Sequence, residues 1–341
     1  MDSASRQKAS TNSASVAVIG AGLAGLACAR RLADAGLHAR VFEAQRAPGG
    51  RLAARRFAVA SFDHGAQYLT AADAGFRAIL ERAECAGAAG RWEPDWPQRD
   101  ANGELWVGVP AMNALPRHLA EGLDVEYGSR IVRLERNRRG WTLLDDRGSA
   151  HADFSAVALA LPAPLASALA GSRTPLTQRV KAVPMAPCWA ALVAFDAPLA
   201  GLPDAGFASD PVLRWFARNG SKPGRDARDA WVLHASPEWS RVELDQPAHE
   251  VLHLLLECFA AFAGRALPRA LVSDVHRWRH ARVESPLGED CLLDADAGIG
   301  FCGDWCLDAR AEAAWLSGAA LGRALAEARE TIGSGKIRDS R

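Results

Sequence analysis

Apolar residues near the start of the chain form a pattern typical of a buried strand followed by one face of a helix. Residues 16–19 are all apolar, which favours a strand covered on both faces. After three glycines, apolar residues recur at helical spacing from Leu23 to Leu32, and Gly36 ends this pattern. The sequence therefore predicts a helix over 23–35, and residues 38–42 predict a second strand.

The middle of the chain has the alternating pattern of short strands, and helical periodicity returns towards its end. Strands are expected at 123–127, 131–135, 141–144, 156–161, 188–195 and 230–234. Helices are expected at 249–267 and 312–329, and loops at 92–106 and 219–225. A short apolar segment at 300–304 precedes the last helix. Dinucleotide-fold elements thus lie at both ends, so we expect an α/β protein with a Rossmann-type domain and a discontinuous α+β second domain.

Three glycines join the first predicted strand to the first helix. Gly20, Gly22 and Gly25 have the G-x-G-x-x-G spacing, in which the first allows a tight turn and the second lets the backbone approach a pyrophosphate. The third lets the helix pack closely, and the free N–H groups of the helix start face the phosphates. Glu43 ends the second strand, near the expected distance of about 20 residues for a ribose-binding carboxylate. This arrangement predicts dinucleotide binding.

Composition narrows the class of protein. The 341 residues carry a formal net charge of +0, which argues against nucleic acid as a partner of the whole molecule. The seven cysteines are scattered, so they predict neither a disulfide framework nor a metal site, and they suit a reducing cytoplasm. No run of about 20 apolar residues is present, so no membrane span is expected. Oligomeric state is not readable from these properties.

Two further glycine motifs extend the dinucleotide signature. Gly50-Arg51 follows the second strand, and Gly303-Asp304 ends the late apolar segment. This order of motifs resembles that of flavoproteins related to amine oxidases, and the chain is similar to renalase, especially the bacterial renalase-like flavoproteins. The stretches that carry the resemblance are 62–68, 106–112, 215–225, 231–240, 276–278, 302–306 and 312–318.

The resemblance implies non-covalent FAD. The FAD-binding domain would be assembled from 14–75, 119–165 and 272–330, and the substrate domain from 76–118 and 166–271, with disordered tails at 1–13 and 331–341. A helix start near 315–318 would face the flavin. The implied cofactor-binding residues are Gly20, Gly22, Leu23, Ala24, Gly25, Glu43, Gly50, Arg51, Gly65, Ala66, Gln67, Ile131, Gly303, Asp304, Trp315 and Leu316.

The resemblance also implies a reaction. Renalase-like enzymes oxidise dihydropyridine isomers of NAD(P)H that are reduced at the 2- or 6-position, and dioxygen reoxidises the flavin to give hydrogen peroxide. The ring nitrogen expels the hydride, so no general base is required, and the sequence identifies no catalytic side chain. Candidates for the substrate pocket are Gln67, Tyr68, Trp215, His234, Trp239 and Trp278. The histidine and the tryptophans are equally typical of core packing. Lys222 and Arg225 lie in a loop rich in proline and glycine, where they would either meet a substrate phosphate or, as is more typical, be solvated.

Three alternatives remain open at this point. An amine oxidase or desaturase would carry the same glycine motifs. A flavin-binding sensor without turnover would bind FAD but resist reduction. An NAD(P)-only dehydrogenase would not need Gly303-Asp304.

Overall fold

A computed structural model describes residues 15–99, 103–226 and 228–338. Its larger sheet has the order β16–β17–β10–β1–β2–β7, with β8 and β9 joined to β10 as a hairpin. The parallel strands are β1 (Ser15–Ile19), β2 (Ala39–Glu43), β7 (Asp124–Tyr127), β10 (Ala150–Leu159) and β17 (Ile299–Phe301). The antiparallel ones are β8 (Ile131–Asn137), β9 (Gly140–Asp145) and β16 (Leu292–Asp294). This is the Rossmann-type arrangement that the sequence predicts.

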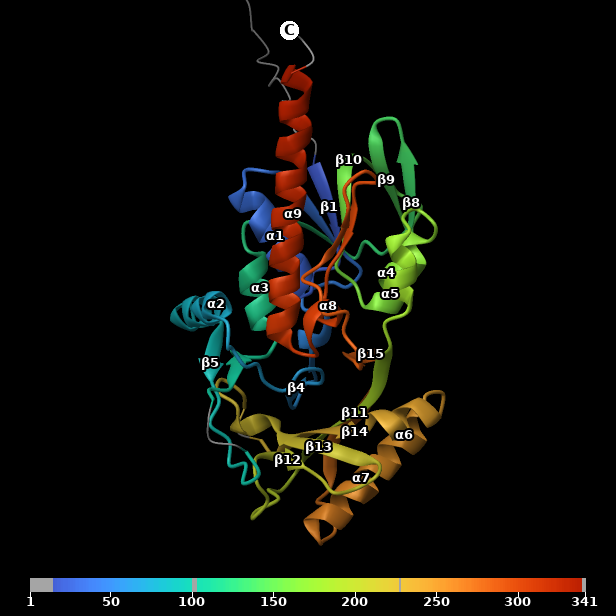
Figure 1. The fold of residues 1–341 in the computed structure, drawn as a ribbon. Coiled ribbons are helices and arrows are strands. Elements are labelled where there is room, and N and C mark those ends of the chain that lie inside the picture. Colours follow the sequence, from blue (N-terminus) through green and yellow to red (C-terminus); the bar gives the residue numbers. More distant parts are fainter. Residues whose placement is uncertain (1–14, 100–102, 227, 339–341) are drawn as a thin grey trace, which may run out of the picture.

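Both faces of this sheet are covered, which is why β1 is apolar at consecutive positions. Val16 and Val18 pack in a cluster with α1 (Leu23–Asp34), α3 (Ala114–Ala120) and α9 (Ala311–Arg338). Ala17 and Ile19 pack in a second cluster with α4 (Ala163–Ala170) and α5 (Leu176–Lys181). Figure 1 shows α1 and α9 side by side. A Cβ at Gly318 of α9 would lie 1.9 Å from the Ala24 carbonyl oxygen, so this glycine allows the close contact between the two helices.

The second sheet is antiparallel throughout and has the order β12–β13–β14–β11–β15. Its strands are β12 (Ala205–Phe207), β13 (Leu213–Arg218), β14 (Ala230–Ala235), β11 (Met185–Phe195) and β15 (Ala270–Val283). Alternate residues of β11 face opposite sides. Ala191 and Val193 pack towards α7 (Ala248–Ala263), whereas Leu192 and Ala194 pack against Phe62 of β4 (Ser61–Asp63). Figure 1 shows α7 and α6 (Pro237–Val242) beside this sheet, away from the larger one.

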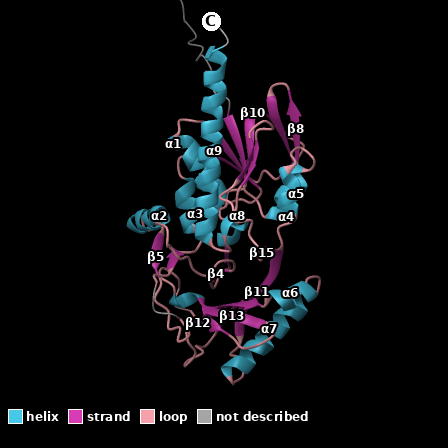
Figure 2. Cartoon of the chain, viewed as in Figure 1, coloured by secondary structure: helices cyan, strands magenta, loops and turns pink. Residues whose placement is uncertain are grey.

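The remaining elements are mostly short, and Figure 2 shows β4 and the helix α8 between the two larger blocks, with α2 and β5 to one side. They are η1 (Gly50–Leu52), β3 (Ala54–Arg56), β4 (Ser61–Asp63), α2 (Ala74–Cys85), β5 (Ala89–Arg91), β6 (Trp106–Gly108), η2 (Asn219–Ser221) and α8 (Asp304–Leu307). The long strand β15 pairs with β11 from end to end, and its later residues also contact Arg51 of η1 and His64 just after β4. The candidate site is built from these elements.

The structure differs from the sequence-based expectations at the end of the chain and in one loop. Helix α9 continues past the expected end at 329 to Arg338. Residues 1–13 and 339–341 of the expected tails lie outside the described residues. The segment 219–225 begins with the turn η2, and the charged side chains of Lys222 and Arg225 within it are buried, for a reason given below. Within the described residues, no helix is both long enough and apolar enough to cross a membrane.

Candidate functional site

The glycine-rich turn leaves open backbone at the start of α1. Gly20 has a φ of +104°, and a Cβ there would lie 2.5 Å from the Ala160 carbonyl oxygen. A Cβ at Gly25 would lie 1.9 Å from the Gly20 carbonyl oxygen. By contrast, no described atom comes within 4 Å of a Cβ built at Gly22, and one built at Gly50 would be 3.6 Å from the Cα of Gly22. The turn therefore fits a cofactor whose pyrophosphate approaches the backbone.

Glu43 is fixed by the backbone around it. Its two carboxylate oxygens accept hydrogen bonds from the Ala21 and Gln45 N–H groups, each at 2.8 Å. The Ser129 N–H donates to the Glu43 carbonyl oxygen at 2.9 Å, and Ile131 begins β8 just beyond. The Ser129 hydroxyl is buried and has no hydrogen-bond partner among the described residues. A buried hydroxyl without a partner beside an oriented carboxylate fits the ribose of a bound dinucleotide.

Arg51 and Asp304 are brought together from opposite ends of the chain. The guanidinium contacts the carboxylate through both terminal nitrogens, with N–O distances of 2.8 and 2.5 Å. Arg51 also donates to the Ala281 carbonyl oxygen at 3.1 Å, so β15 takes part in this contact. The Gly303 N–H donates to the Ser317 hydroxyl at 3.1 Å, which ties the start of α8 to α9. The two motifs Gly50-Arg51 and Gly303-Asp304 therefore form one structural unit.

Trp315 and Leu316 lie in the first turns of α9. Both pack in the same hydrophobic cluster as Leu23 and Ala24 of α1. Trp315 is buried, with its ring centroid 6.2 Å from that of Phe76. Helix packing accounts for these two side chains, and their predicted contact with a flavin stays a prediction.

The segment after β4 passes tightly between Arg51 and β15. A Cβ at Gly65 would lie 2.0 Å from the Arg51 carbonyl oxygen and 3.3 Å from the Trp278 ring, so only glycine fits. The Ala66 N–H donates to the same Arg51 oxygen at 2.9 Å. Gly65 and Ala66 are thus held directly beside the Arg51–Asp304 unit, and their predicted flavin contact stays a prediction.

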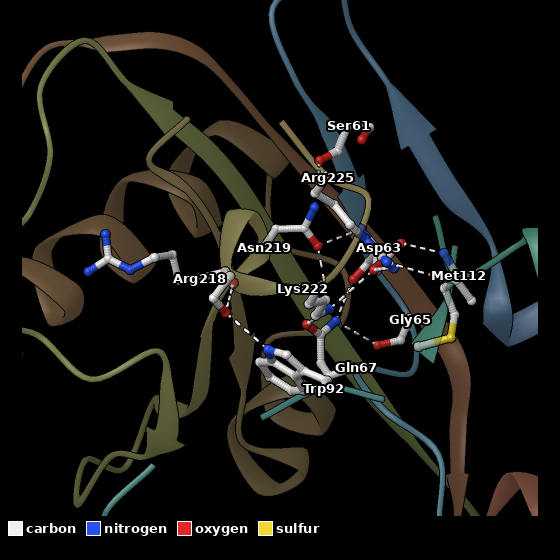
Figure 3. Close-up of polar contacts among 12 residues, drawn as sticks. Ser61, Asp63, Gly65, Gln67, Trp92, Met112, Arg218, Asn219, Lys222 and Arg225 are labelled. Carbon is white, nitrogen blue, oxygen red and sulfur yellow. Dashed lines mark hydrogen bonds and ion pairs between the residues drawn. The ribbon is translucent and has the colours of Figure 1, made fainter. Parts of the chain in front are cut away.

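A buried ionic network lies on the other side of this segment (Figure 3). The Lys222 ammonium contacts Asp63 at 3.2 Å, the Gln67 side-chain oxygen at 3.0 Å and the Asn219 side-chain oxygen at 3.4 Å. Arg225 contacts the same carboxylate oxygen of Asp63 at 2.6 Å. The side chains of Lys222, Arg225 and Asp63 are each no more than 1% exposed.

The network carries a surplus positive charge, because one carboxylate faces two cations. Burial alone would raise the pKa of Asp63, but Lys222 and Arg225 hold it below its usual value, helped by the Met112 N–H at 2.8 Å. Burial lowers the pKa of Lys222 to about 8, and the attraction of Asp63 opposes this effect. A buried surplus charge of this kind favours negative charge on whatever binds next to it.

This network corrects the expectation of a solvated loop at 219–225. Lys222 and Arg225 are buried because Asp63, far away in the sequence, supplies their counter-charge. No local pattern announces the pairing, since 159 positions separate Lys222 from Asp63. A lysine and an arginine three residues apart in a loop rich in glycine and proline are typical of an exposed turn, and this composition misled the interpretation.

Four aromatic side chains form a second cluster beside Gln67. Tyr68, Trp96, Phe207 and Trp215 pack together, with ring-centroid distances of 4.8 Å for Trp96–Trp215, 4.9 Å for Phe207–Trp215 and 5.9 Å for Tyr68–Trp215. We call these four residues the aromatic box. The indole N–H groups of Trp96 and Trp215 are buried and have no hydrogen-bond partner among the described residues.

Histidines and Trp278 border Gly65 on the β15 side. The His64 ring stacks on Trp278 with a centroid distance of 5.1 Å, and its centroid lies 4.8 Å from that of His276. The Trp278 N–H donates to the His64 carbonyl oxygen at 2.9 Å. Burial lowers the pKa of His64 to about 3, with a further contribution from His276. Burial likewise lowers the pKa of His234 to about 4. Both imidazoles are therefore neutral and weakly basic at neutral pH.

The predicted pocket residues are brought together in part. Gln67 precedes Tyr68, Tyr68 contacts Trp215, and Trp215 pairs with His234 across β13 and β14. Trp278 lies nearby through Gly65. Trp239, on α6, instead packs in the cluster that faces α7 on the opposite side of the second sheet. The sequence did not predict that Asp63, Ser129 and Trp96 belong to the candidate site.

Comparison with protein families gives two matches. Residues 18–83 match the NAD(P)-binding Rossmann-like domain, and residues 71–321 match the flavin containing amine oxidoreductases. The second match extends over more than half of the 341 residues.

Solved structures with this fold include several oxidases. A double mutant of putrescine oxidase is 16% identical, with a TM-score of 0.70 and coverage of 93% of this chain and 99% of that one. A putative protoporphyrinogen oxidase from Exiguobacterium sp. 255-15 is 12% identical, with a TM-score of 0.71 and coverage of 92% and 99%. Cyclohexylamine oxidase from Brevibacterium oxydans IH-35A is 12% identical, with a TM-score of 0.69 and coverage of 93% and 100%. At these identities the likeness concerns the fold.

Proposed function

The chain belongs to the flavin containing amine oxidoreductases, and on this premise we propose that it is a renalase-like oxidase of dihydropyridine isomers of NAD(P)H. The substrates would be the isomers reduced at the 2- or 6-position of the pyridine ring. The substrate loses one hydride and becomes NAD(P)⁺. Dioxygen takes up the two electrons of this hydride and two protons, and becomes hydrogen peroxide. FAD, when bound, supplies the hydride acceptor at its N5 atom and passes the electrons on to dioxygen.

The observation that carries the proposal is the state of the ionisable groups around residues 63–67. Asp63 is bound by Lys222 and Arg225, and Asp304 is bound by Arg51. The lowered pKa of His64 makes it a weak base at neutral pH. Such a site suits a substrate that gives up a hydride without first losing a proton, because the ring nitrogen supplies the electron pair and aromaticity is regained.

The residues that hold FAD in this proposal are those expected from the sequence. The glycine turn and the first turn of α1 would face the pyrophosphate, and Glu43 would accept from the ribose hydroxyls. Arg51 would contribute positive charge while Asp304 keeps it in place. We further propose that FAD is held without a covalent bond and that the FAD domain comprises 14–75, 119–165 and 272–330, with 76–118 and 166–271 forming the substrate domain.

Oxidation of an amine is the alternative on the same fold. The names of two structural neighbours, putrescine oxidase and cyclohexylamine oxidase, motivate it. The surplus positive charge of Lys222 and Arg225 opposes it, because most aliphatic amines are cations at neutral pH. The family assignment to oxidoreductases gives no support to a sensor without turnover.

A cytoplasmic location is part of the proposal. All seven cysteines are free thiols in the structure. Burial raises the pKa of Cys188 to about 12, which makes it an unreactive thiol. Free thiols suit a reducing compartment.

The test is anaerobic mixing of the FAD-loaded protein with NADH that contains the 2- and 6-dihydro isomers, while the visible flavin band is recorded. We expect rapid bleaching that air reverses with release of hydrogen peroxide. Ordinary NADH freed of both isomers is the control. Bleaching by an amine panel but not by the isomers would establish the alternative instead.

A further inference from the structure

The aromatic box has hydrogen-bond donors with no acceptor. The N–H groups of Trp96 and Trp215 are both buried and unpartnered among the described residues, and Trp215 is only 5% exposed. A buried donor left without an acceptor is unfavourable, so such a group calls for a partner such as a bound ligand or a water molecule. Two such donors in adjoining rings, with centroids 4.8 Å apart, indicate a ligand with acceptor atoms.

Positive charge surrounds the box. The Arg99 N–H donates to the Trp96 carbonyl oxygen at 3.0 Å, so Arg99 adjoins the box. Burial raises the pKa of Tyr68, while the positive charges of Arg282 and Arg99 act to lower it. The Arg214 guanidinium lies 5.1 Å from the Phe207 ring centroid. In the part of the chain that the structure describes, none of these three arginines has a carboxylate within 4.0 Å.

The box also adjoins the buried ionic network. The ring centroids of Trp92 and Tyr68 are 6.5 Å apart, and the Lys222 ammonium lies 5.4 Å from the Trp92 ring centroid. Gln67, the neighbour of Tyr68 in the chain, accepts from the same ammonium. The surplus charge of the network therefore adds to that of the three arginines.

These features define the chemistry of the ligand. Aromatic walls favour a flat ring, the free indole N–H groups require acceptors on that ring, and the arginines require negative charge attached to it. A protonated amine meets the second and third requirements poorly. A nucleotide meets all three, since its base is flat and carries acceptors and its phosphate is an anion.

We infer that Tyr68, Trp96, Phe207 and Trp215 form a nucleotide-binding subsite, with Arg99, Arg214 and Arg282 placed to meet the phosphate. The subsite would hold one half of the dinucleotide substrate, so the inference rests on the proposed function. The nicotinamide and adenine halves share the required chemistry, and the experiment distinguishes them.

The experiment is calorimetric titration of the FAD-loaded full-length protein with NAD⁺, which binds without reacting. Trp96→Leu removes a ring and a free donor, and we expect binding at least about tenfold weaker, because a base stacks favourably on an aromatic ring. Arg282→Gln should weaken binding and reduce its dependence on salt. Matched controls are Trp239→Leu, outside the box, and Arg279→Gln, on the same strand but paired with Asp245. Both controls should bind NAD⁺ like the unaltered protein.

Two mononucleotides identify the half that is bound. If nicotinamide mononucleotide loses affinity in Trp96→Leu and adenosine monophosphate does not, the box holds the nicotinamide half; the reverse result assigns the adenine half. Unchanged NAD⁺ affinity in Trp96→Leu and Arg282→Gln, or no NAD⁺ binding by the unaltered protein, would overturn the inference.

Measurements of flavin reduction distinguish a failure of the proposed subsite from a failure of the proposed function. If the isomers bleach the flavin with the same KM in Trp96→Leu as in the unaltered protein, the reaction stands and the subsite is wrong. If NAD⁺ binding depends on the box but the isomers leave the flavin oxidised, the subsite stands and the proposed reaction is wrong.

Discussion

Arg51 and Asp304, separated by 253 positions, form a two-pronged ion pair in which both terminal nitrogens of the guanidinium contact the carboxylate. The Asp304 side chain is 7% exposed and that of Arg51 is 30% exposed. The pair joins the turn after β2 to the segment before α9, which are the two ends of the predicted cofactor site. We therefore expect this contact to matter for folding and, in the proposed function, for cofactor binding.

Replacing Asp304→Asn should destabilise the FAD-free protein. The change keeps the shape of the side chain but leaves the Arg51 charge partly buried without a partner, and we expect a loss of about 1–2 kcal/mol in the free energy of unfolding. Urea unfolding of the FAD-free protein measures it. Arg241→Gln, which breaks an exposed pair with Glu284, is the control and should cost less than about 1 kcal/mol. Equal losses in the two variants would contradict the special role of the first pair.

Replacing Glu43→Ala should weaken FAD binding. It removes the acceptor proposed for the ribose and also frees the Ala21 and Gln45 N–H groups. The expected loss in binding free energy is about 1.5–3 kcal/mol, measured from FAD dissociation constants by flavin fluorescence. Glu126→Gln, on the neighbouring strand β7, is the control. An unchanged FAD dissociation constant in Glu43→Ala would show that Glu43 does not bind the ribose.

Replacing Lys222→Met should change how stability depends on pH in the alkaline range. Burial lowers the pKa of Lys222 from 10.5 to about 8, so between these values the unfolded chain binds more protons than the folded one. The stability that Lys222 contributes therefore rises as the pH increases from about 8 to 10.5, and it is constant below 8. Urea unfolding at pH 7.5 and pH 9.5 should show this rise in the unaltered protein relative to the variant. A difference between the two proteins that does not change with pH would contradict the assignment.

Replacing His64→Gln should reduce sensitivity to acid. Because burial lowers the pKa of His64 from 6.5 to about 3, the folded protein resists its protonation. Stability is fully present above pH 6.5 and is lost as the pH falls towards 3, by at most about 1.4 kcal/mol per pH unit for one group. Thermal unfolding between pH 7 and pH 4.5 should show a smaller loss in the variant. His249→Gln, an exposed histidine, should leave the acid response unchanged.

Local sequence patterns were sufficient for the first dinucleotide-binding unit. The strand β1, the glycine turn, α1 and β2 follow from apolar spacing and from the three glycines, and the structure has them within a residue or two of the predicted ends. The long α9 extends beyond its predicted end because apolar periodicity fades before the helix does. The assignment of the late Gly303-Asp304 to the same site came from the resemblance to a flavoprotein family.

The charged and aromatic parts of the site were not predictable in the same way. Arg225 is buried beside a carboxylate that lies 162 positions away, so its environment depends on where the fold places the end of β4. Trp96 lies in a segment without periodicity, and only the fold places its ring against Trp215. Long-range contacts of this kind leave no mark in a single sequence.

The path of β15 has a mechanical consequence. This strand is hydrogen-bonded along β11 in the second sheet, yet its later residues hold Arg51 through the Ala281 carbonyl oxygen and His64 through Trp278. A single continuous strand thus contacts both halves of the molecule. A hinge motion that separated the sheets would have to bend β15 or break two hydrogen bonds, the one between Arg51 and Ala281 and the one between Trp278 and His64. Opening and closing of the two halves would then be transmitted directly to the turn that is proposed to carry the cofactor.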